Sequence, residues 1–332
     1  MPGLIMDVVD SVLAGLDNGM DRLRRWGLGD APAAALLLFP ALTILTVFGM
    51  APLVASAYMS LYGGKHGMGP FIGLGNYAEA LQSPAFRRSF LVTVYYAAGT
   101  VPTTMLFSFL IAYGLHRIVR GRGLLRTLYF LPYVTSAVAA AMVWRALLNP
   151  QTGIVNVLFV RFGLTAQQWL LEPRGVLHLI SGGWIPPELG PSLALCCIIL
   201  FDIWHGSGFM VVVFLAGMAA IPRELEEAAR MDGAGGLRVV RHVVIPLLSP
   251  TIFFLGVVGA VRAFQAFNSF YALTQGGRTL GTTENLVLHI YSNFYEYGYW
   301  GYGAAVAVLL STAIIALTVI QWRLVGRRVH YS

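Results

Sequence analysis

The residue types that most often carry catalysis or bind metals are scattered through this chain of 332 residues. Its seven histidines show no His-Glu-x-x-His spacing, the arrangement that places two zinc ligands on one helix face. Cys196 and Cys197 are adjacent in an apolar run, so we expect them to pack as small hydrophobic side chains. The sequence therefore predicts no metal site and no disulfide framework, and it argues against a membrane enzyme.

The single lysine bears on nucleotide chemistry. Lys65 stands in the sequence Gly-Gly-Lys-His-Gly, whereas a phosphate-binding P-loop needs a Gly-Lys-Ser/Thr run after a glycine-rich turn. We therefore expect no P-loop of this type and no cofactor in this chain. Any ATP hydrolysis that drives its function must take place on a partner protein.

The composition of the chain indicates that its structural elements lie in a lipid membrane. Hydrophobic residues make up 57% of the chain and charged residues 11%, whereas about a quarter of the residues of a soluble domain are charged. A soluble chain with so few charges could not cover its surface with polar groups, so membrane lipid is the expected partner. The net charge of +7 does not indicate nucleic-acid binding, because the basic residues cluster between apolar segments instead of forming one face.

Six apolar segments are long enough to span a membrane as helices, for which about 20 residues are needed. Proline and glycine inside them are tolerated, and we expect kinks there. The predicted fold class is an all-α polytopic membrane protein with about six transmembrane helices. The segments cover residues 33–60, 90–115, 127–148, 191–220, 250–272 and 303–325.

The distribution of arginine predicts that both termini lie in the cytoplasm, since basic residues are enriched in cytoplasmic loops. Residues 1–32 then form a cytoplasmic segment, either an amphipathic helix on the membrane surface or a poorly ordered tail. Residues 33–326 form the membrane domain, and residues 327–332 form a short cytoplasmic tail. The arginine clusters placed in the cytoplasm lie at 22–25, 117–126, 223–241 and 323–328.

The cytoplasmic segment between the fourth and fifth spans is more structured than a connector needs to be. Pro222 suits the first position of a helix, and Glu226 and Arg230 lie four apart in the stabilising order. Gly233 supplies a left-handed cap, so we expect a short helix at 222–232, followed by a second amphipathic stretch. Such a helix could fit a groove on a partner protein or rest on the bilayer, and physical reasoning favours neither.

The same segment carries a family motif. Glu227-Ala228-Ala229 is followed by Gly233 and by Val243-Val244-Ile245-Pro246, and this pattern resembles the EAA loop of bacterial binding-protein-dependent ABC importers. Asp232-Gly233-Ala234 is similar to the carbohydrate-uptake branch, which contains the maltose and glycerol-phosphate types of permease. Further segments that resemble this branch lie at 71–77, 130–132, 149–153 and 273–277.

The resemblance implies a non-catalytic permease subunit of the type I ABC importer architecture in the bacterial cytoplasmic (inner) membrane. Its EAA loop, residues 222–249, would contain a cytoplasmic coupling helix. Two ATP-binding subunits would be separate chains that bind ATP and Mg. A second, related permease would complete the pathway, and an external binding protein or lipoprotein would deliver a sugar or sugar derivative. The implied coupling residues are Glu227, Ala228, Ala229, Asp232, Gly233 and Pro246.

The fifth span carries polar and aromatic residues of the kind that line transport pathways. Treated as one continuous helix, it places Arg262 and Gln265 on one face and Asn268 with aromatic residues on the other. Aromatic rings can stack on the C–H face of a sugar while amides bind its hydroxyl groups, but helix–helix packing could use the same residues. The candidate pathway residues are Gln265, Asn268, Phe264, Phe267, Tyr271, Tyr133 and Ser136.

Other positions leave alternatives open. Asp202 and His205 in the fourth span either line the cavity or pair with each other. Asn268 stands where the family usually has an acidic residue, and residues 180–191 form an insertion that either contacts the binding protein or is a tolerated surface loop. A permease for a non-sugar solute is an alternative function, as is a secondary transporter, although the internal repeat typical of the latter is not evident.

Overall fold

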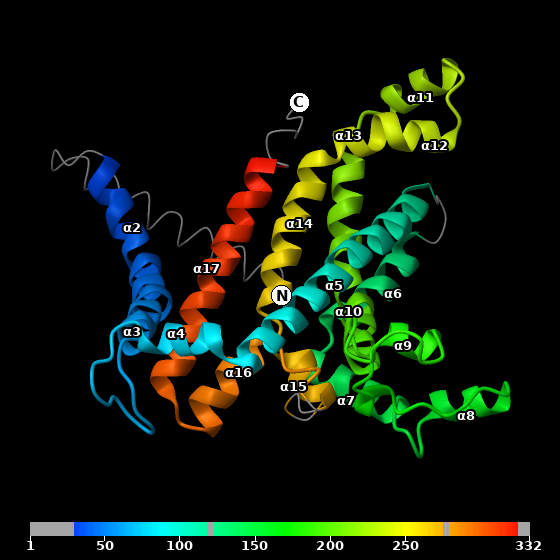
Figure 1. Ribbon diagram of the computed structural model, residues 1–332. Coiled ribbons are helices and arrows are strands. Elements are labelled where there is room, and N and C mark those ends of the chain that lie inside the picture. Colours follow the sequence, from blue (N-terminus) through cyan, green and yellow to red (C-terminus); the bar gives the residue numbers. More distant parts are fainter. Residues whose placement is uncertain (1–29, 118–121, 275, 277–278, 280, 325–332) are drawn as a thin grey trace, which may run out of the picture. The chain divides into compact units, whose positions relative to one another are not determined.

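The computed structural model of the chain is nearly all helical (Figure 1). In the described residues, extended pairing is limited to two isolated bridges, Tyr62 with Phe71 and Gly175 with Ser192. The predicted all-α class is therefore confirmed. The predicted N-terminal surface helix and the C-terminal tail 327–332 fall outside the described residues. The structure describes residues 30–117, 122–274, 276, 279 and 281–324.

The chain divides into one unit that ends at Tyr58 and a second that begins at Met59. In the first unit, an apolar helical stretch begins at Leu37, has a mean hydropathy of 2.1 and is 0% buried within the protein. Such a surface is stable only against lipid or another apolar surface, and the stretch agrees with the predicted span 33–60. The elements are α2 (Asp30–Ile44), η1 (Leu45–Met50) and α3 (Ala51–Met59).

Three long helices of the second unit agree with predicted spans. Their 34, 27 and 25 residues exceed the length that crosses a bilayer. The predictions placed these helices at 90–115, 191–220 and 303–325, so their existence and approximate bounds are confirmed. The helices are α5 (Pro84–Arg117), α10 (Leu193–Ala219) and α17 (Trp300–Leu324).

Helix α5 packs against α10 through small and polar residues. Thr100, Thr104 and Ser108 are buried and recur every four residues, so they lie on one face of α5. The Ser108 hydroxyl donates a hydrogen bond to the carbonyl of Ser207 in α10 at 3.1 Å. Small residues allow such close approach between membrane helices, and hydroxyl groups join them.

The third predicted span, 127–148, is not one continuous helix. Helices α6 (Arg122–Val134) and α7 (Ala137–Leu147) meet at an angle of 93°. Ser136 leaves the helical conformation, with ψ 122°, and its hydroxyl accepts a hydrogen bond from the N–H of Ala139. Pro132 also lacks the N–H that would extend the ladder of α6. Because of Ser136 and Pro132, the predicted kink is instead a complete break between α6 and α7.

The fifth predicted span, 250–272, is also interrupted. Helix α14 (Ser249–Phe264) ends early, and α15 (Asn268–Thr274) is a separate helix. By length and composition, the described residues hold four helices that could cross a membrane, or six if each of two bent pairs is one span. The second bent pair joins α14, at 69°, to the helical run of α12 (Gly236–Val239), η3 (Val240–Val244) and α13 (Ile245–Leu247).

Short helices lie at the lower edge of Figure 1, where they connect the long ones. Three buried apolar clusters hold this unit together: one around α7, α10 and α15, one around α5, α10 and the segment before α14, and one around α16 and α17. The short helices are α4 (Gly75–Gln82), α8 (Ile154–Arg161), η2 (Trp169–Leu171), α9 (Val176–Ile180), α16 (Leu286–Tyr291) and η4 (Ser292–Glu296).

An ion pair fixes the loop that precedes α10. Arg174 donates to both carboxylate oxygens of Glu172, at 2.7 Å and 2.8 Å, and these hydrogen bonds hold the pKa of Glu172 below its usual value. A lowered pKa in the folded state stabilises the fold above the ordinary glutamate pKa of about 4.3, and this contribution is lost as the pH falls through the lowered value. Because Arg174 is half exposed, solvent screens the pair and its contribution to the free energy of unfolding is small.

We therefore expect Glu172→Gln to accelerate hydrogen exchange in residues 172–194 up to about fivefold at pH 7. The difference from the unsubstituted protein should vanish when the pH falls below the lowered pKa. Exchange measured by mass spectrometry and corrected for intrinsic rates checks this, with the exposed Glu188→Gln as the control. Equal protection of this loop at pH 7 would contradict the assignment.

Candidate functional site

Helix α11 (Arg223–Met231) forms the centre of the segment that carries the family motif. Pro222 precedes it, and its carbonyl accepts from the N–H of Leu225. The predicted ion pair within the helix is present, with Arg230 Nη2 3.6 Å from Glu226 Oε2. The helix bounds agree with the predicted 222–232 to within one residue at each end.

The helix is stopped by backbone geometry. Gly233 has a φ of +80°, the left-handed conformation that L side chains adopt only with strain. The N–H of Gly233 donates to the carbonyl of Arg230, and the N–H of Ala234 donates to the carbonyl of Ala229, each at 3.0 Å. This pair of hydrogen bonds is the Schellman motif, which satisfies the last carbonyls of the helix and redirects the chain.

The motif residues face in two directions. Glu227, Ala228, Asp232 and Gly233 are exposed, whereas Ala229 is half-buried against the apolar cluster that joins α5 and α10. Pro246 is half-buried in α13.

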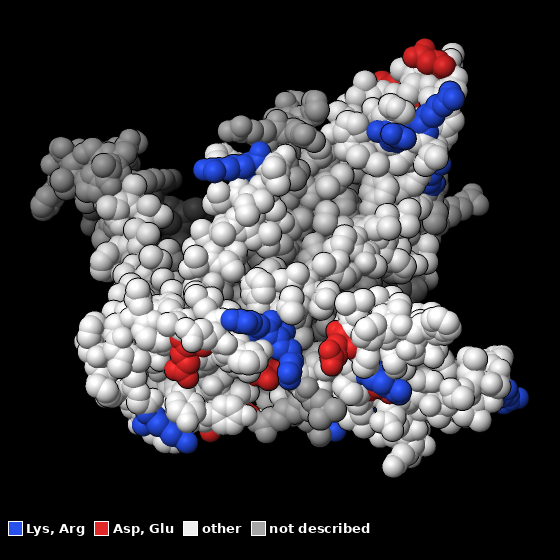
Figure 2. All heavy atoms as spheres, in the orientation of Figure 1, with Lys and Arg blue, Asp and Glu red and all other residues white. Residues whose placement is uncertain are grey.

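The surroundings of α11 are exposed. In Figure 1, α11 and α12 extend beyond the ends of the long helices, and Figure 2 shows acidic atoms at the tip of this projection and basic atoms beside it. Met231 and Leu237 are 88% and 82% exposed, which is unusual for large apolar side chains at a water-exposed loop.

Buried residues anchor this projection. Val239 and Val244 are 0% and 1% exposed and pack in the cluster that contains Leu115 of α5 and Phe214 of α10. An element with an exposed tip and a close-packed base moves together with the helices to which it is attached, because packed interiors have low compressibility. The arrangement can transmit displacement from a docked partner to α5, α10 and α14.

A second region is a cavity of about 350 Å³ between α5, α6, α10 and the α14–α15 junction. Four of the predicted pathway residues line it: Tyr133, Gln265, Phe267 and Asn268. The other lining side chains that can interact with a ligand are Tyr96, Thr100, Thr104, Asp202, His205, Arg262 and Ser269.

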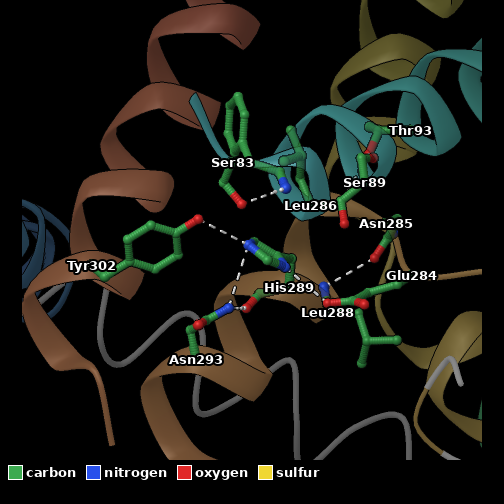
Figure 3. A network of polar contacts seen from close by, with 11 residues as sticks. Ser83, Ser89, Thr93, Glu284, Asn285, Leu286, Leu288, His289, Asn293 and Tyr302 are labelled. Carbon is green, nitrogen blue, oxygen red and sulfur yellow. Dashed lines mark hydrogen bonds and ion pairs between the residues drawn. The ribbon is translucent and has the colours of Figure 1, made fainter. Parts of the chain in front are cut away.

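The interruption between α14 and α15 explains how Gln265 and Phe267 can line one cavity, because a continuous helix would place these two positions about 160° apart. The expectation that Gln265 and Asn268 lie on opposite faces is wrong, since both line the cavity and positions three apart share a face even on a continuous helix. The Asn285 side-chain amide donates to the carbonyl of Ala266, within the interruption. The Oδ1 atom of Asn285 accepts from the N–H of Leu288 at 3.0 Å (Figure 3). Asn285 thus satisfies a carbonyl that the broken helix leaves without its usual partner.

Three predicted pathway residues lie outside the cavity lining. Phe264 packs in the apolar cluster around α16 and α17. Tyr271 stacks on Phe267 with the ring centroids 5.3 Å apart. Ser136 caps α7.

The charged residues of the cavity have separate partners. Arg262 donates to the hydroxyl of Tyr133 at 3.1 Å and lies over the Tyr133 and Phe209 rings. Asp202 accepts from the hydroxyl of Tyr96 at 2.7 Å, and His205 Nε2 lies 3.3 Å from the carbonyl of Thr135. The alternative that Asp202 and His205 pair with each other is therefore wrong.

Sequence reasoning missed Tyr96 and Asn285. The buried polar residues of α5, which recur every four positions, were a signal for Tyr96. Asn285 lies in a connecting loop, and no local pattern indicated its role. In the described residues, no group of three or more His, Cys, Asp or Glu side chains is placed to hold a metal ion.

Comparisons with known proteins identify the family of this chain. Residues 71–331 match the family described as the binding-protein-dependent transport system inner membrane component. The sn-glycerol-3-phosphate transport system permease protein of Agrobacterium fabrum is 33% identical over 300 residues, which cover 90% of this chain and 96% of the relative. The trehalose/maltose transport system permease protein of Thermococcus litoralis is 29% identical over 300 residues, 90% of this chain and 95% of the relative.

The fold is similar to that of solved transporters. A crystal structure of a bacterial ABC transporter involved in the import of the acidic polysaccharide alginate has a chain with a TM-score of 0.74 and 21% identity, which covers 93% of this chain and 99% of that chain. A crystal structure of the alginate transporter in complex with a periplasmic protein gives a TM-score of 0.76 at 21% identity, with 92% and 96% coverage. The chain therefore belongs to the family of binding-protein-dependent transport system inner membrane components, as a non-catalytic ABC importer permease subunit whose ATPase is a separate chain.

Proposed function

We propose that this permease forms half of a translocation pathway for a sugar or sugar derivative and that loop 222–249 couples it to two ATP-binding subunits. The observation that carries the coupling role is the exposed helix α11, which is capped by Gly233 and anchored through Val239 and Val244. The absence of a P-loop sequence around Lys65 fits this role, because ATP and Mg then bind on the partner chains. A second, related permease completes the pathway.

The proposed mechanism is alternating access. ATP binding closes the two partner subunits, and their movement displaces α11. Because the base of the projection packs against α5 and α10, both of which also line the cavity, the displacement changes the side from which the cavity opens. An external binding protein then releases its solute into the open cavity.

The cavity chemistry supports a carbohydrate as the solute. Phe267 and Tyr133 offer ring faces, and Gln265 and Asn268 offer amides that donate and accept hydrogen bonds. Trehalose and maltose, the substrates named for the relative from Thermococcus litoralis, are carbohydrates of this kind.

The arginine distribution supports a cytoplasmic position for both termini and for α11. The proposed division is a cytoplasmic segment 1–32, a membrane domain 33–326 and a cytoplasmic tail 327–332.

Co-purification of the tagged full-length chain, followed by identification of the bound proteins, tests the proposed assembly. We expect a second permease, a P-loop ATPase and, in the presence of solute, a binding protein. Recovery of copies of this chain alone would instead favour a secondary transporter.

The cavity assignment leads to a separate prediction. We expect the double variant Gln265→Ala with Asn268→Ala to raise the KM for uptake about thirtyfold, because two ligand hydrogen bonds of about 1 kcal/mol each are lost. Association with the ATPase should be unchanged. Gln151→Ala, which removes an exposed amide from a loop, is the control. An unchanged KM in the double variant would remove these residues from the pathway.

A further inference from the structure

A continuous row of aromatic rings leads out of the cavity. Its four members, called the aromatic row below, are Phe267, Tyr271, Tyr291 and Tyr295, from the α14–α15 junction, α15, α16 and η4. The Phe267 and Tyr291 ring centroids are 5.2 Å apart, and those of Tyr291 and Tyr295 are 5.3 Å apart. Tyr271 contacts both Phe267 and Tyr291, at 5.3 Å and 5.7 Å.

The two ends of the row differ in their surroundings. Phe267 lines the cavity, whereas Tyr295 is 72% exposed. Tyr271, between them, is 41% exposed. The ring surface is thus open along the row and continuous with the cavity, while the cavity itself contributes only the first ring.

Tyrosine combines a ring face with a polar edge. The electrostatic effect of the neighbouring Tyr271 raises the pKa of Tyr291. A surface of this kind suits a ligand that has apolar faces and hydroxyl edges.

A pyranose ring is such a ligand. Its face presents C–H groups with partial positive charge, which the negative face of an aromatic ring attracts. The hydroxyl groups of the sugar lie at its edge, where they can bond to water or to the tyrosine hydroxyls. A small polar solute without a ring face would gain little from four aromatic rings.

Two other roles for these rings predict different positions. An aromatic belt at the lipid interface places each ring at headgroup level, independently of any cavity. A contact surface for a second permease would need shape complementarity and buried surface area, but it would not need tyrosine hydroxyl groups. The contact of Tyr291 with Phe267, which lines the cavity, favours a path for the transported solute over both alternatives.

We propose that the aromatic row is a carbohydrate-binding subsite outside the central cavity and that it binds the additional pyranose units of an oligosaccharide. This inference rests on the proposed sugar transport. It extends that function by naming the substrate class as sugars longer than one ring, because a monosaccharide held in the cavity would not reach Tyr295.

Saturation-transfer NMR on the purified full-length transporter complex tests the proposal. The probes are glucose, maltotriose, cellotriose and sn-glycerol 3-phosphate, with saturation applied to the aromatic protons of the protein. We expect at least one trisaccharide to receive saturation on the C–H groups of two or more ring units. Tyr295→Ala should lower this signal at least threefold, whereas Tyr295→Phe should retain most of it.

The matched control is Tyr297→Ala, an exposed tyrosine two positions away and outside the row, which should leave the signal unchanged. A trisaccharide signal that is lost in Asn268→Ala but unaffected by Tyr295→Ala would contradict sugar binding by the aromatic row and leave the proposed sugar transport intact. No signal from any carbohydrate, with a signal from sn-glycerol 3-phosphate, would overturn both. A shift in melting temperature in lipid nanodiscs without loss of the sugar signal would assign Tyr295 to the lipid interface and overturn the proposal.

Discussion

Gly233→Val is expected to uncouple the permease from its ATPase while the membrane helices remain folded. Gly233 has a φ of +80°, and a β-branched side chain in that conformation costs about 1–3 kcal/mol. A Cβ atom there would meet no other atom within 4 Å, so the effect comes from the backbone and not from a clash. Relief of the strain breaks the Schellman hydrogen bonds and moves the end of α11.

Association with the ATPase should fall about tenfold or more, since each 1.4 kcal/mol corresponds to a factor of ten. Co-purification of the ATPase and ATP-driven uptake in proteoliposomes are the two measurements. Glu227→Ala, at an exposed position of the same helix, removes a motif side chain without backbone strain and should weaken the same association.

The control for backbone strain is Gly163→Val. Gly163 has a φ of +77°, and a Cβ atom at this position would also meet no other atom within 4 Å, but the residue follows α8, far from loop 222–249 in the sequence. It should carry the same local strain and keep normal ATPase association. If Gly233→Val and Glu227→Ala both behaved like Gly163→Val, the coupling role of α11 would be wrong.

The features of α11 could be predicted because their causes are local. A proline before the helix, an i,i+4 ion pair and a glycine after it act within a dozen residues, and the structure has each of them. The long helices α5, α10 and α17 were predictable for a related reason. Their apolar length is set by the bilayer and does not depend on which other helix they contact.

The geometry of the cavity could not be predicted, because its causes are distant in the sequence. No proline or glycine marks the interruption between Phe264 and Asn268. The group that stabilises it, the amide of Asn285, is 19 residues away from Ala266. A helical wheel drawn through the interruption therefore separates Gln265 from Phe267, although both line one cavity.

The same reasoning makes Asn285→Leu the substitution with the largest expected effect on stability. Asn285 is fully buried, and leucine fills a similar volume without any polar group. The carbonyl of Ala266 and the N–H of Leu288 would each lose a partner in a buried environment, at about 1–3 kcal/mol for each group. We expect the free energy of unfolding to fall by roughly 2–6 kcal/mol and uptake to be lost almost completely.

Asn285→Asp separates the two hydrogen bonds. A carboxylate can still accept from the N–H of Leu288 but cannot donate to the carbonyl of Ala266, so the interruption should open while the start of α16 remains capped. Uptake should then fall although the N-terminal cap of α16 is retained. Hydrogen exchange in residues 261–274, compared with that in 286–291, distinguishes the two effects.

Asn149→Leu is the control, because its Oδ1 also accepts backbone hydrogen bonds, from Gln151 and Thr152, but at exposed positions where water can replace it. Asn149→Leu should lower the free energy of unfolding by no more than about 1 kcal/mol. If Asn285→Leu melted at the same temperature as Asn149→Leu and transported normally, the interruption would not depend on Asn285. The position of Gln265 and Phe267 on one cavity would then have to arise from the packing of α15 alone, and the cavity would be a property of the apolar cluster around Phe201 and Phe270.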